Sequence, residues 1–142
     1  MARFHSWCER RGYKAYQEWD FPSINTIKEF VEDEAKSTAK ELFKEFFSDL
    51  PVQELKRRLE EGELIDDDVD TRIREEADVL LTWNLDNILV AYAYAGEYEP
   101  EKLTDVPKTI EEYAKAVAYE VWVSKITEKL EETVKEAVRG GE

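Results

Sequence analysis

The sequence predicts an all-α protein, built as a single bundle of four to five helices with a long C-terminal helix. Apolar residues recur every three or four positions through most of the chain, which is the period of helices that bury one face. The 142 residues include only five glycines and four prolines, and no run rich in them separates one part from another. We therefore expect one domain over residues 1–142.

The first clear helix is expected from about Ser23 to Ser48. Pro22 stops the preceding segment, and Thr26 with Glu29 has the spacing of a capping box, in which two side chains satisfy the free amides of the first turn. The apolar positions that follow at helical spacing are Ile27, Phe30, Val31, Ala35, Ala39, Leu42 and Phe46. This pattern is typical of a helix with one buried face.

A second helix is expected from Pro51 to about Glu61, because proline suits the first turn of a helix. Gly62 follows it and is expected in the left-handed conformation that often ends a helix. Asp67 or Asp68 is then expected to cap the next helix, since a carboxylate accepts hydrogen bonds from first-turn amides.

The apolar period continues from Val69 to Ala95, which predicts one long helix. The alternative is two helices, with the hydroxyl of Thr82 capping the second. Residues 85–95 are apolar nearly all round, and such a helix lies either at the centre of a fold or between two subunits.

The last helix is expected from about Thr109 to Val138. Thr109 and Glu112 have capping-box spacing. The preceding helix is expected to end at Gly96, and an acidic loop over residues 97–105 follows it. At about 30 residues and ~1.5 Å of rise per residue, this helix would be ~45 Å long.

Residues 1–22 are expected to form an irregular segment in which aromatic and basic side chains alternate. The plain interpretation is that the rings cover one end of the core. The alternative is that basic and aromatic side chains stack on nucleic-acid bases. His5 is the single histidine of the chain, so it does not predict a metal site.

Negative charge is concentrated in one part of the chain. Residues 60–105 hold fifteen acidic residues against three basic ones, a net charge of −12 out of −14 for the whole chain. Like charges crowded together destabilise a compact state, so a local excess suggests that it is used for binding a cationic surface. The predicted partner-binding residues are Glu60, Glu61, Glu63, Asp66, Asp67, Asp68, Asp70, Glu75, Glu76, Asp78, Asp86, Glu97, Glu99, Glu101 and Asp105.

The residue inventory does not predict a catalytic site or a cofactor. The chain has one histidine, near its start, and one cysteine, Cys8. These residues do not predict a Ser-His-Asp or Cys-His catalytic set, and a single cysteine cannot form a disulfide within the chain. No glycine-rich phosphate loop is present. We therefore expect a protein that is not an enzyme and holds no metal.

The composition also predicts the compartment and the class of partner. No apolar run approaches the ~20 residues needed to cross a bilayer, and the first residues do not resemble a signal peptide. A cytoplasmic location is expected. Direct binding of nucleic acid is not expected, because a chain with a net charge of −14 is repelled by DNA, which carries about one negative charge per 1.7 Å of its axis.

Part of the chain resembles the Ocr-type phage antirestriction proteins. The matching signs are Ile73 followed by Ala77 and Asp78, the aromatic turn at Trp83, and Asp86 before an apolar run. They continue with Gly96 before an acidic loop, and then Ala118-Tyr119-Glu120 and Leu130 in a long terminal helix. Proteins of that family are acidic, all-α imitations of a DNA duplex.

The resemblance implies a function and an assembly. The chain would be a viral DNA mimic that occupies the basic nucleic-acid groove of a host defence nuclease, of the restriction or CRISPR type, in the host cytoplasm. It also implies a homodimer, with Trp83, Ile88, Leu89 and Tyr92 at the dimer interface. A helical protein–protein interaction module without mimicry is the alternative among binding proteins.

One alternative is enzymatic. Glu75 and Asp78 lie three residues apart, as in the second metal-binding motif of the all-α MazG-like nucleotide pyrophosphohydrolases. That resemblance implies that Glu29 and Glu32 form the first motif. It also implies a bound Mg²⁺, an ion that prefers carboxylate oxygens.

Overall fold

The structure is a computed structural model that describes residues 3–11, 23–98 and 110–141. Over these ranges the chain forms six helices and no strand: α1 (Arg3–Arg10), α2 (Ile24–Phe46), α3 (Val52–Glu61), α4 (Asp67–Leu80), α5 (Asn84–Ala93) and α6 (Ile110–Gly141). The predicted all-α fold and the long C-terminal helix are confirmed. The predicted number of four to five helices is too low by one, because α1 is also helical; residues 69–95 form two helices, which is the alternative that the sequence left open.

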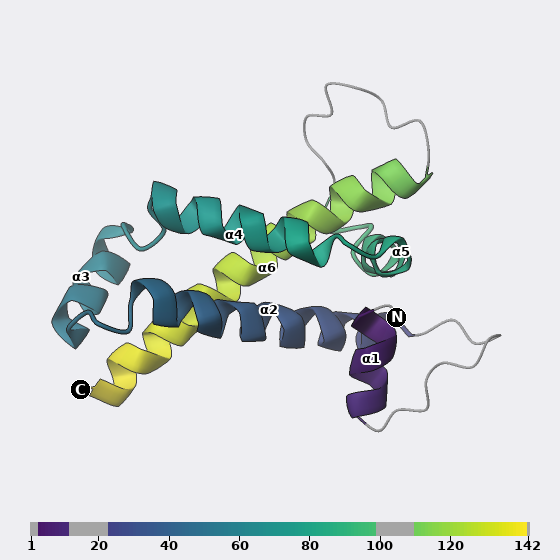
Figure 1. The fold of residues 1–142 in the computed structure, drawn as a ribbon. Helices are drawn as coiled ribbons and strands as arrows, with labels where there is room; N and C mark the ends of the chain where they lie inside the picture. The colour runs from purple at the N-terminus through teal and green to yellow at the C-terminus, as the bar shows by residue number, and fades with distance from the viewer. Residues whose placement is uncertain (1–2, 12–22, 99–109, 142) are drawn as a thin grey trace.

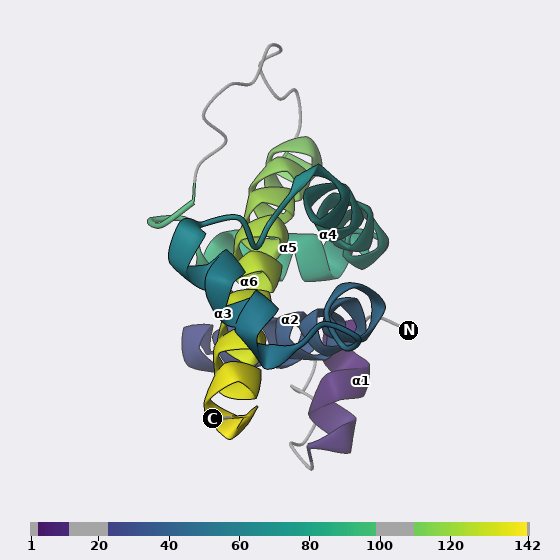
Figure 2. The same ribbon diagram turned by 90° about the vertical axis from the view of Figure 1, so that its left-hand side faces the viewer.

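Helix α6 runs through the middle of the molecule (Figures 1 and 2). Its 32 residues make a rod of about 48 Å, and it contacts α2, α3, α4 and α5 along its length. The fully buried apolar side chains on α6 include Val117, Ala118, Val121, Trp122, Ile126, Leu130 and Val134. The hydrophobic core is therefore organised around α6, and α2, α3, α4 and α5 cover its sides.

The caps of α2, α3 and α4 follow from local chemistry. Ser23 caps α2 by accepting a hydrogen bond from the amide of Thr26 at 3.1 Å, so the predicted capping box at Thr26 and Glu29 is wrong by one turn. Gly62 ends α3 with φ +70°, as predicted. Asp66 caps α4 through the amide of Val69 at 2.9 Å, one residue before the predicted caps.

The apolar period of residues 69–95 conceals a sharp turn between α4 and α5. Leu81 and Thr82 close the last turn of α4, and Trp83 is extended, with φ −109° and ψ 114°. Trp83, not Thr82, occupies the position before α5. The side-chain amide of Asn87 donates a hydrogen bond of 3.1 Å to the carbonyl of Leu81, which would otherwise lack a partner at the end of α4.

The predicted irregular N-terminal segment is wrong for residues 3–10, which form α1. Phe4, Trp7 and Cys8 have i, i+3, i+4 spacing and are buried together. The rings of Phe4 and Trp7 lie edge-on to Phe30 of α2, at centroid distances of 5.4 and 5.8 Å, and Phe30 in turn contacts Trp122. The expectation that N-terminal rings cover the core is confirmed for these two. Residues 12–22, which complete the predicted segment, and the predicted capping residue Thr109 lie outside the described ranges.

Candidate protein-binding surface

Acidic side chains are numerous on α3, in the connection after it and on α4. Residues 54–78 contain eleven acidic and five basic residues, a net charge of −6. The buried side of α4 is formed by Val69, Ile73, Ala77 and Leu80, which face α6 and α2. Asp67, Asp68, Glu75 and Asp78 consequently lie on the solvent side. We call this region of residues 54–78 the acidic edge.

Asp86 does not belong to a binding surface, so this part of the site prediction is wrong. Its side chain is only 2% exposed, and its two carboxylate oxygens each accept a hydrogen bond of 3.3 Å from the backbone amide of Phe4. The carboxylate thus lies at the first turn of α1, where amides have no partner within their own helix. Burial raises the pKa of Asp86, and the amides of Phe4 and Arg3 oppose that rise.

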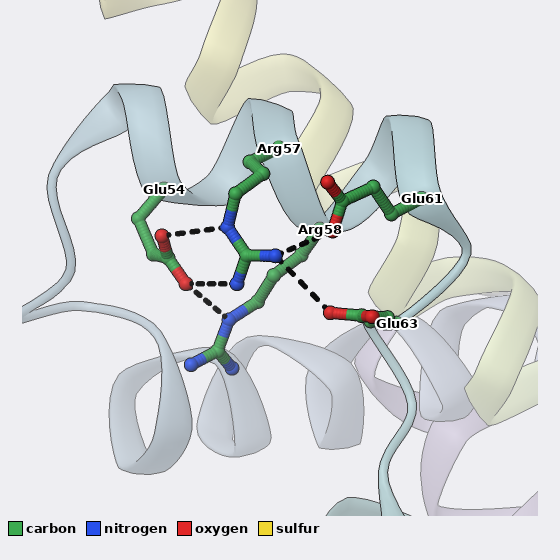
Figure 3. Close-up of polar contacts among 5 residues, drawn as sticks. All are labelled: Glu54, Arg57, Arg58, Glu61 and Glu63. Carbon is green, nitrogen blue, oxygen red and sulfur yellow. Dashed lines mark hydrogen bonds and ion pairs between the residues drawn. The ribbon is translucent and has the colours of Figure 1, made fainter.

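Several carboxylates of the acidic edge are paired with arginines of the same chain. Arg57 of α3 contacts Glu54, Glu61 and Glu63 at once, and Arg58 also reaches Glu54 at 3.1 Å (Figure 3). The hydrogen bonds that Arg57 and Arg58 donate to Glu54 lower the pKa of Glu54 to about 2. The hydrogen bonds that Arg57 donates to Glu54 and Glu63 in turn raise the pKa of Arg57. Three carboxylates share mainly one cation here, so this cluster keeps a negative charge.

Two further arginines act in the same way on α4. Arg72 contacts Glu75 and Glu76 on its own helix, both at 3.0 Å, and Glu45 of α2 at 3.1 Å. Arg74 pairs with Asp70 at 2.9 Å and donates a hydrogen bond of 3.4 Å to the Tyr119 hydroxyl on α6. These contacts raise the pKa of both guanidinium groups, chiefly through Glu45 for Arg72 and Tyr119 for Arg74.

The predicted partner-binding residues therefore fall into four groups. Ion pairs within the chain engage Glu61, Glu63, Asp70, Glu75, Glu76 and Glu97, the last through Lys28 at 3.2 Å. Asp66 is a helix cap and Asp86 is buried. Glu60, Asp67, Asp68 and Asp78 are exposed and make no ion pair within the described residues. Glu99, Glu101 and Asp105 lie outside the described ranges.

Next to the acidic edge, the outer face of α5 exposes large apolar side chains. Leu85 and Tyr92 are exposed, and Ile88 between them is half-buried. Trp83, just before α5, is exposed as well, and so is Val79 at the end of α4. Sequence reasoning missed Val79 and Leu85, because a run that is apolar on every side does not indicate which side faces the core.

The predicted dimer interface is divided by this arrangement. Leu89 is 2% exposed and lies in the core of its own chain with Val90, so its assignment to an interface is wrong. Trp83, Ile88 and Tyr92 remain accessible to a partner. For the residues on the inner side of α5, central burial is the interpretation that the structure supports.

The four carboxylates implied by the pyrophosphohydrolase resemblance do not come together. Glu32 of α2 is paired with Lys129 of α6 at 3.8 Å, whereas Glu75 of α4 is paired with Arg72. Among the described residues, no three histidine, cysteine or acidic side chains are close enough to hold a metal ion together. The geometry that this resemblance requires is therefore not formed by the described part of the chain.

Glu29 and Glu32 instead line a polar cavity of about 640 Å³, together with Asn25, Lys28, Tyr94, Glu97, Tyr98 and Lys125. The ammonium groups of Lys28 and Lys125 lie 5.0 and 5.6 Å from the centre of the Tyr94 ring. Each also pairs with a glutamate, Glu97 and Glu128 respectively. The cavity's charges are thus largely compensated from within the chain, and these pairs explain the lysines without a ligand.

Within the described ranges, no helix combines the length and the apolar character needed to cross a bilayer. Comparison with family models, curated proteins and solved structures finds no match to this chain.

Proposed function

We propose that this chain is an acidic DNA-mimic inhibitor whose acidic edge occupies a basic nucleic-acid-binding groove of a host defence nuclease, of the antirestriction or anti-CRISPR type. The observation that supports the proposal is the cluster of exposed carboxylates at the end of α3 and along α4, four of which make no ion pair with a described cation of the chain. Such a surface attracts a basic groove and repels nucleic acid itself.

The spacing of charge on α4 limits what is imitated. Residues 67–78 contain six acidic and two basic residues, a net charge of −4. Over the ~16 Å of helix that they span, this is about one charge per 4 Å, compared with about 1.7 Å for a DNA duplex and 3.4 Å for one strand. The acidic edge is thus closer in charge density to one strand, which supports a short contact along a groove that holds a single strand or one backbone of a duplex.

The proposed mechanism involves no chemical step. Long-range attraction between opposite charges accelerates the encounter, and the bound helices then exclude nucleic acid from the groove. The four unpaired carboxylates are expected to contribute most, because a carboxylate already paired with Arg57 or Arg72 must share its interaction with that arginine. Binding of this kind weakens as salt concentration rises.

The test measures inhibition of DNA cleavage by a panel of purified restriction and CRISPR nucleases, with the dissociation constant determined over a range of salt concentrations. The Asp67→Asn/Asp68→Asn variant is compared with Glu111→Gln/Glu136→Gln, which removes the same charge from exposed positions of α6. We expect the α4 variant to inhibit more weakly and to reduce the slope of log K against log salt by about two, one for each lost charge. The α6 variant should behave as the wild type.

Other outcomes would favour the other functions. Inhibition or binding that survives neutralisation of Asp67 and Asp68 with an unchanged salt slope would indicate an interaction module without mimicry. Release of pyrophosphate from a nucleoside triphosphate in the presence of Mg²⁺, abolished by Glu75→Gln, would indicate a pyrophosphohydrolase and contradict the proposal.

A further inference from the structure

The exposed apolar side chains are not distributed evenly. Six large apolar side chains are exposed among the described residues, and four of them lie between positions 79 and 92: Val79 at 51%, Trp83 at 39%, Leu85 at 48% and Tyr92 at 52%. Ile88 lies three residues after Leu85, and Tyr92 lies four residues after Ile88, so the three side chains form one stripe along α5. An exposed stripe of this kind on a protein is typical of a binding surface. We call Val79, Trp83, Leu85, Ile88 and Tyr92 the apolar face.

In the sequence, the apolar face follows directly on the acidic edge. Val79 follows Asp78, one of the unpaired carboxylates, on the last turn of α4. Residues 75–98 contain five acidic residues and no lysine or arginine. A macromolecule that spans the end of α4 and the whole of α5 therefore meets no basic side chain of these residues.

The charges decide between two occupants of this face. In a second copy of this chain, the same face is bordered by the same carboxylates, so pairing two copies would bring Glu75, Asp78 and their equivalents near each other. Like charges facing each other across an interface oppose association. A partner with apolar side chains bordered by lysines or arginines places opposite charges at these positions and buries the apolar stripe.

We infer that the apolar face binds an apolar patch bordered by basic residues on the partner protein, next to the groove that the acidic edge occupies. This inference rests on the proposed function and adds a non-ionic contact to it. The burial of Leu85 and Tyr92 side chains supplies affinity that salt does not screen, while the carboxylates supply steering. The partner surface is thus both basic and locally apolar, which bare nucleic-acid mimicry does not require.

The experiment uses two synthetic helical peptides with the same lysines in the same places. One has leucines along the opposite face, and the other has glutamines there. Binding to the full chain is measured by titration calorimetry at low and at physiological salt. We expect the leucine peptide to bind about tenfold more tightly, as the burial of one or two apolar side chains implies. At physiological salt, the leucine peptide should lose a smaller part of its affinity than the glutamine peptide.

Matched variants locate the contact. Leu85→Ser/Tyr92→Ser should abolish the tenfold gain, whereas Ile24→Ser/Tyr113→Ser, which changes exposed apolar side chains elsewhere, should keep it. Circular dichroism verifies that each variant is folded. Equal affinity of the two peptides, or a gain that survives Leu85→Ser/Tyr92→Ser, would overturn the inference.

The same measurements separate this inference from the proposed function. Weak, salt-sensitive binding of both peptides that depends on Asp67 and Asp68 but not on the apolar face would leave the proposed function standing and the inference refuted. Failure of both peptides to bind would contradict both. Sedimentation velocity tests whether a second copy of this chain occupies the face. If the chain is a dimer that Leu85→Ser/Tyr92→Ser converts to a monomer, and the leucine peptide shows no gain in affinity, the face belongs to the homodimer predicted from the sequence.

Discussion

Asp86 shows how a single carboxylate fixes a helix that lies far away in the sequence. It accepts hydrogen bonds from the Phe4 amide, 82 positions earlier, and this amide belongs to the first turn of α1, where the helix itself supplies no acceptor. Burial is the main reason that the pKa of Asp86 is raised above its ordinary value of 3.8. The ionised form is therefore less favourable in the folded protein than in the unfolded chain, despite its hydrogen bonds.

A pH-dependent stability follows at this position. Because the folded-state pKa is raised, the contribution of Asp86 to the free energy of unfolding is greatest at low pH and falls as the pH rises through the folded-state pKa. Asp86→Asn keeps an oxygen acceptor for the Phe4 amide but cannot ionise. We expect the variant to be as stable as the wild type at a pH of about 3.5 and more stable at a pH of about 7, measured by urea unfolding at both values.

A different pH pattern would assign Asp86 another role. The Asp86→Asn variant would be less stable than the wild type at neutral pH if the ionised carboxylate made a net favourable contribution to the docking of α1. Asp33→Asn serves as a control, because Asp33 also contacts α1, through Trp7 and Arg11, but lies on the exposed side of the helix.

At the scale of elements, periodicity predicted the helices that bury one face against α6. The helices α2, α3 and α6 were all predictable in this way, because their apolar residues alternate with charged ones. The turn between α4 and α5 was not, since Leu80, Leu81 and Leu85 continue the apolar period through it. The side chain of Asn87 donates a hydrogen bond to the Leu81 carbonyl just after α4, and the sequence does not show which polar side chain will satisfy that group.

The same limit applied to α1 and to the binding surface. Phe4, Trp7 and Cys8 already had helical spacing, but the eight residues of α1 are too few for a periodic pattern to stand out from a segment of mixed aromatic and basic residues. The acidic excess was evident from composition. Which carboxylates stay unpaired depends on arginines such as Arg72, which reaches Glu45 on another helix, and that contact is set by the packing of α2 against α4.

The Arg57 cluster gives a prediction at this scale. Arg57→Gln removes the cation that Glu54, Glu61 and Glu63 share and makes the acidic edge more negative by one charge. We expect tighter binding of a basic peptide and a steeper salt dependence, because Glu61 and Glu63 become free to meet it and Glu54 keeps only its contact with Arg58. Titration calorimetry with the glutamine peptide at low and at physiological salt measures the affinity and its salt dependence.

Arg139→Gln is the matched control for that variant, since it makes the same charge change at the exposed end of α6. If both variants bind the peptide equally well, then total charge and not the acidic edge determines binding, and the proposed site on α3 and α4 is wrong. The pKa of Glu54 should also return from about 2 toward its ordinary range in Arg57→Gln, because the hydrogen bonds of Arg57 are the main reason for its low value.

In the molecule as a whole, α6 connects α2, α3, α4 and α5 through the core. Ile126 on α6 is fully buried, and α2, α3, α4 and α5 all pack on this helix. We expect Ile126→Ala to reduce the free energy of unfolding by about 2–5 kcal/mol, the usual cost of such a cavity. Far-UV circular dichroism and tryptophan fluorescence should report one coincident transition, because Trp7 and Trp122 belong to the same core as the helices.

Glu136→Ala, on the exposed side of α6, should change that free energy by no more than about 0.5 kcal/mol. Separate transitions for the two optical signals would mean that α1 or α3 unfolds on its own, and that the expected single domain is in fact two cooperative units.

The central place of α6 has a consequence for biosynthesis. The chain leaves the ribosome from its N-terminus, so α2 to α5 emerge before the helix that they surround exists. Until Ile110 to Gly141 have been made, their apolar sides have nothing to close on except one another. We expect the nascent chain to stay open up to that point, and then to collapse in one step around α6.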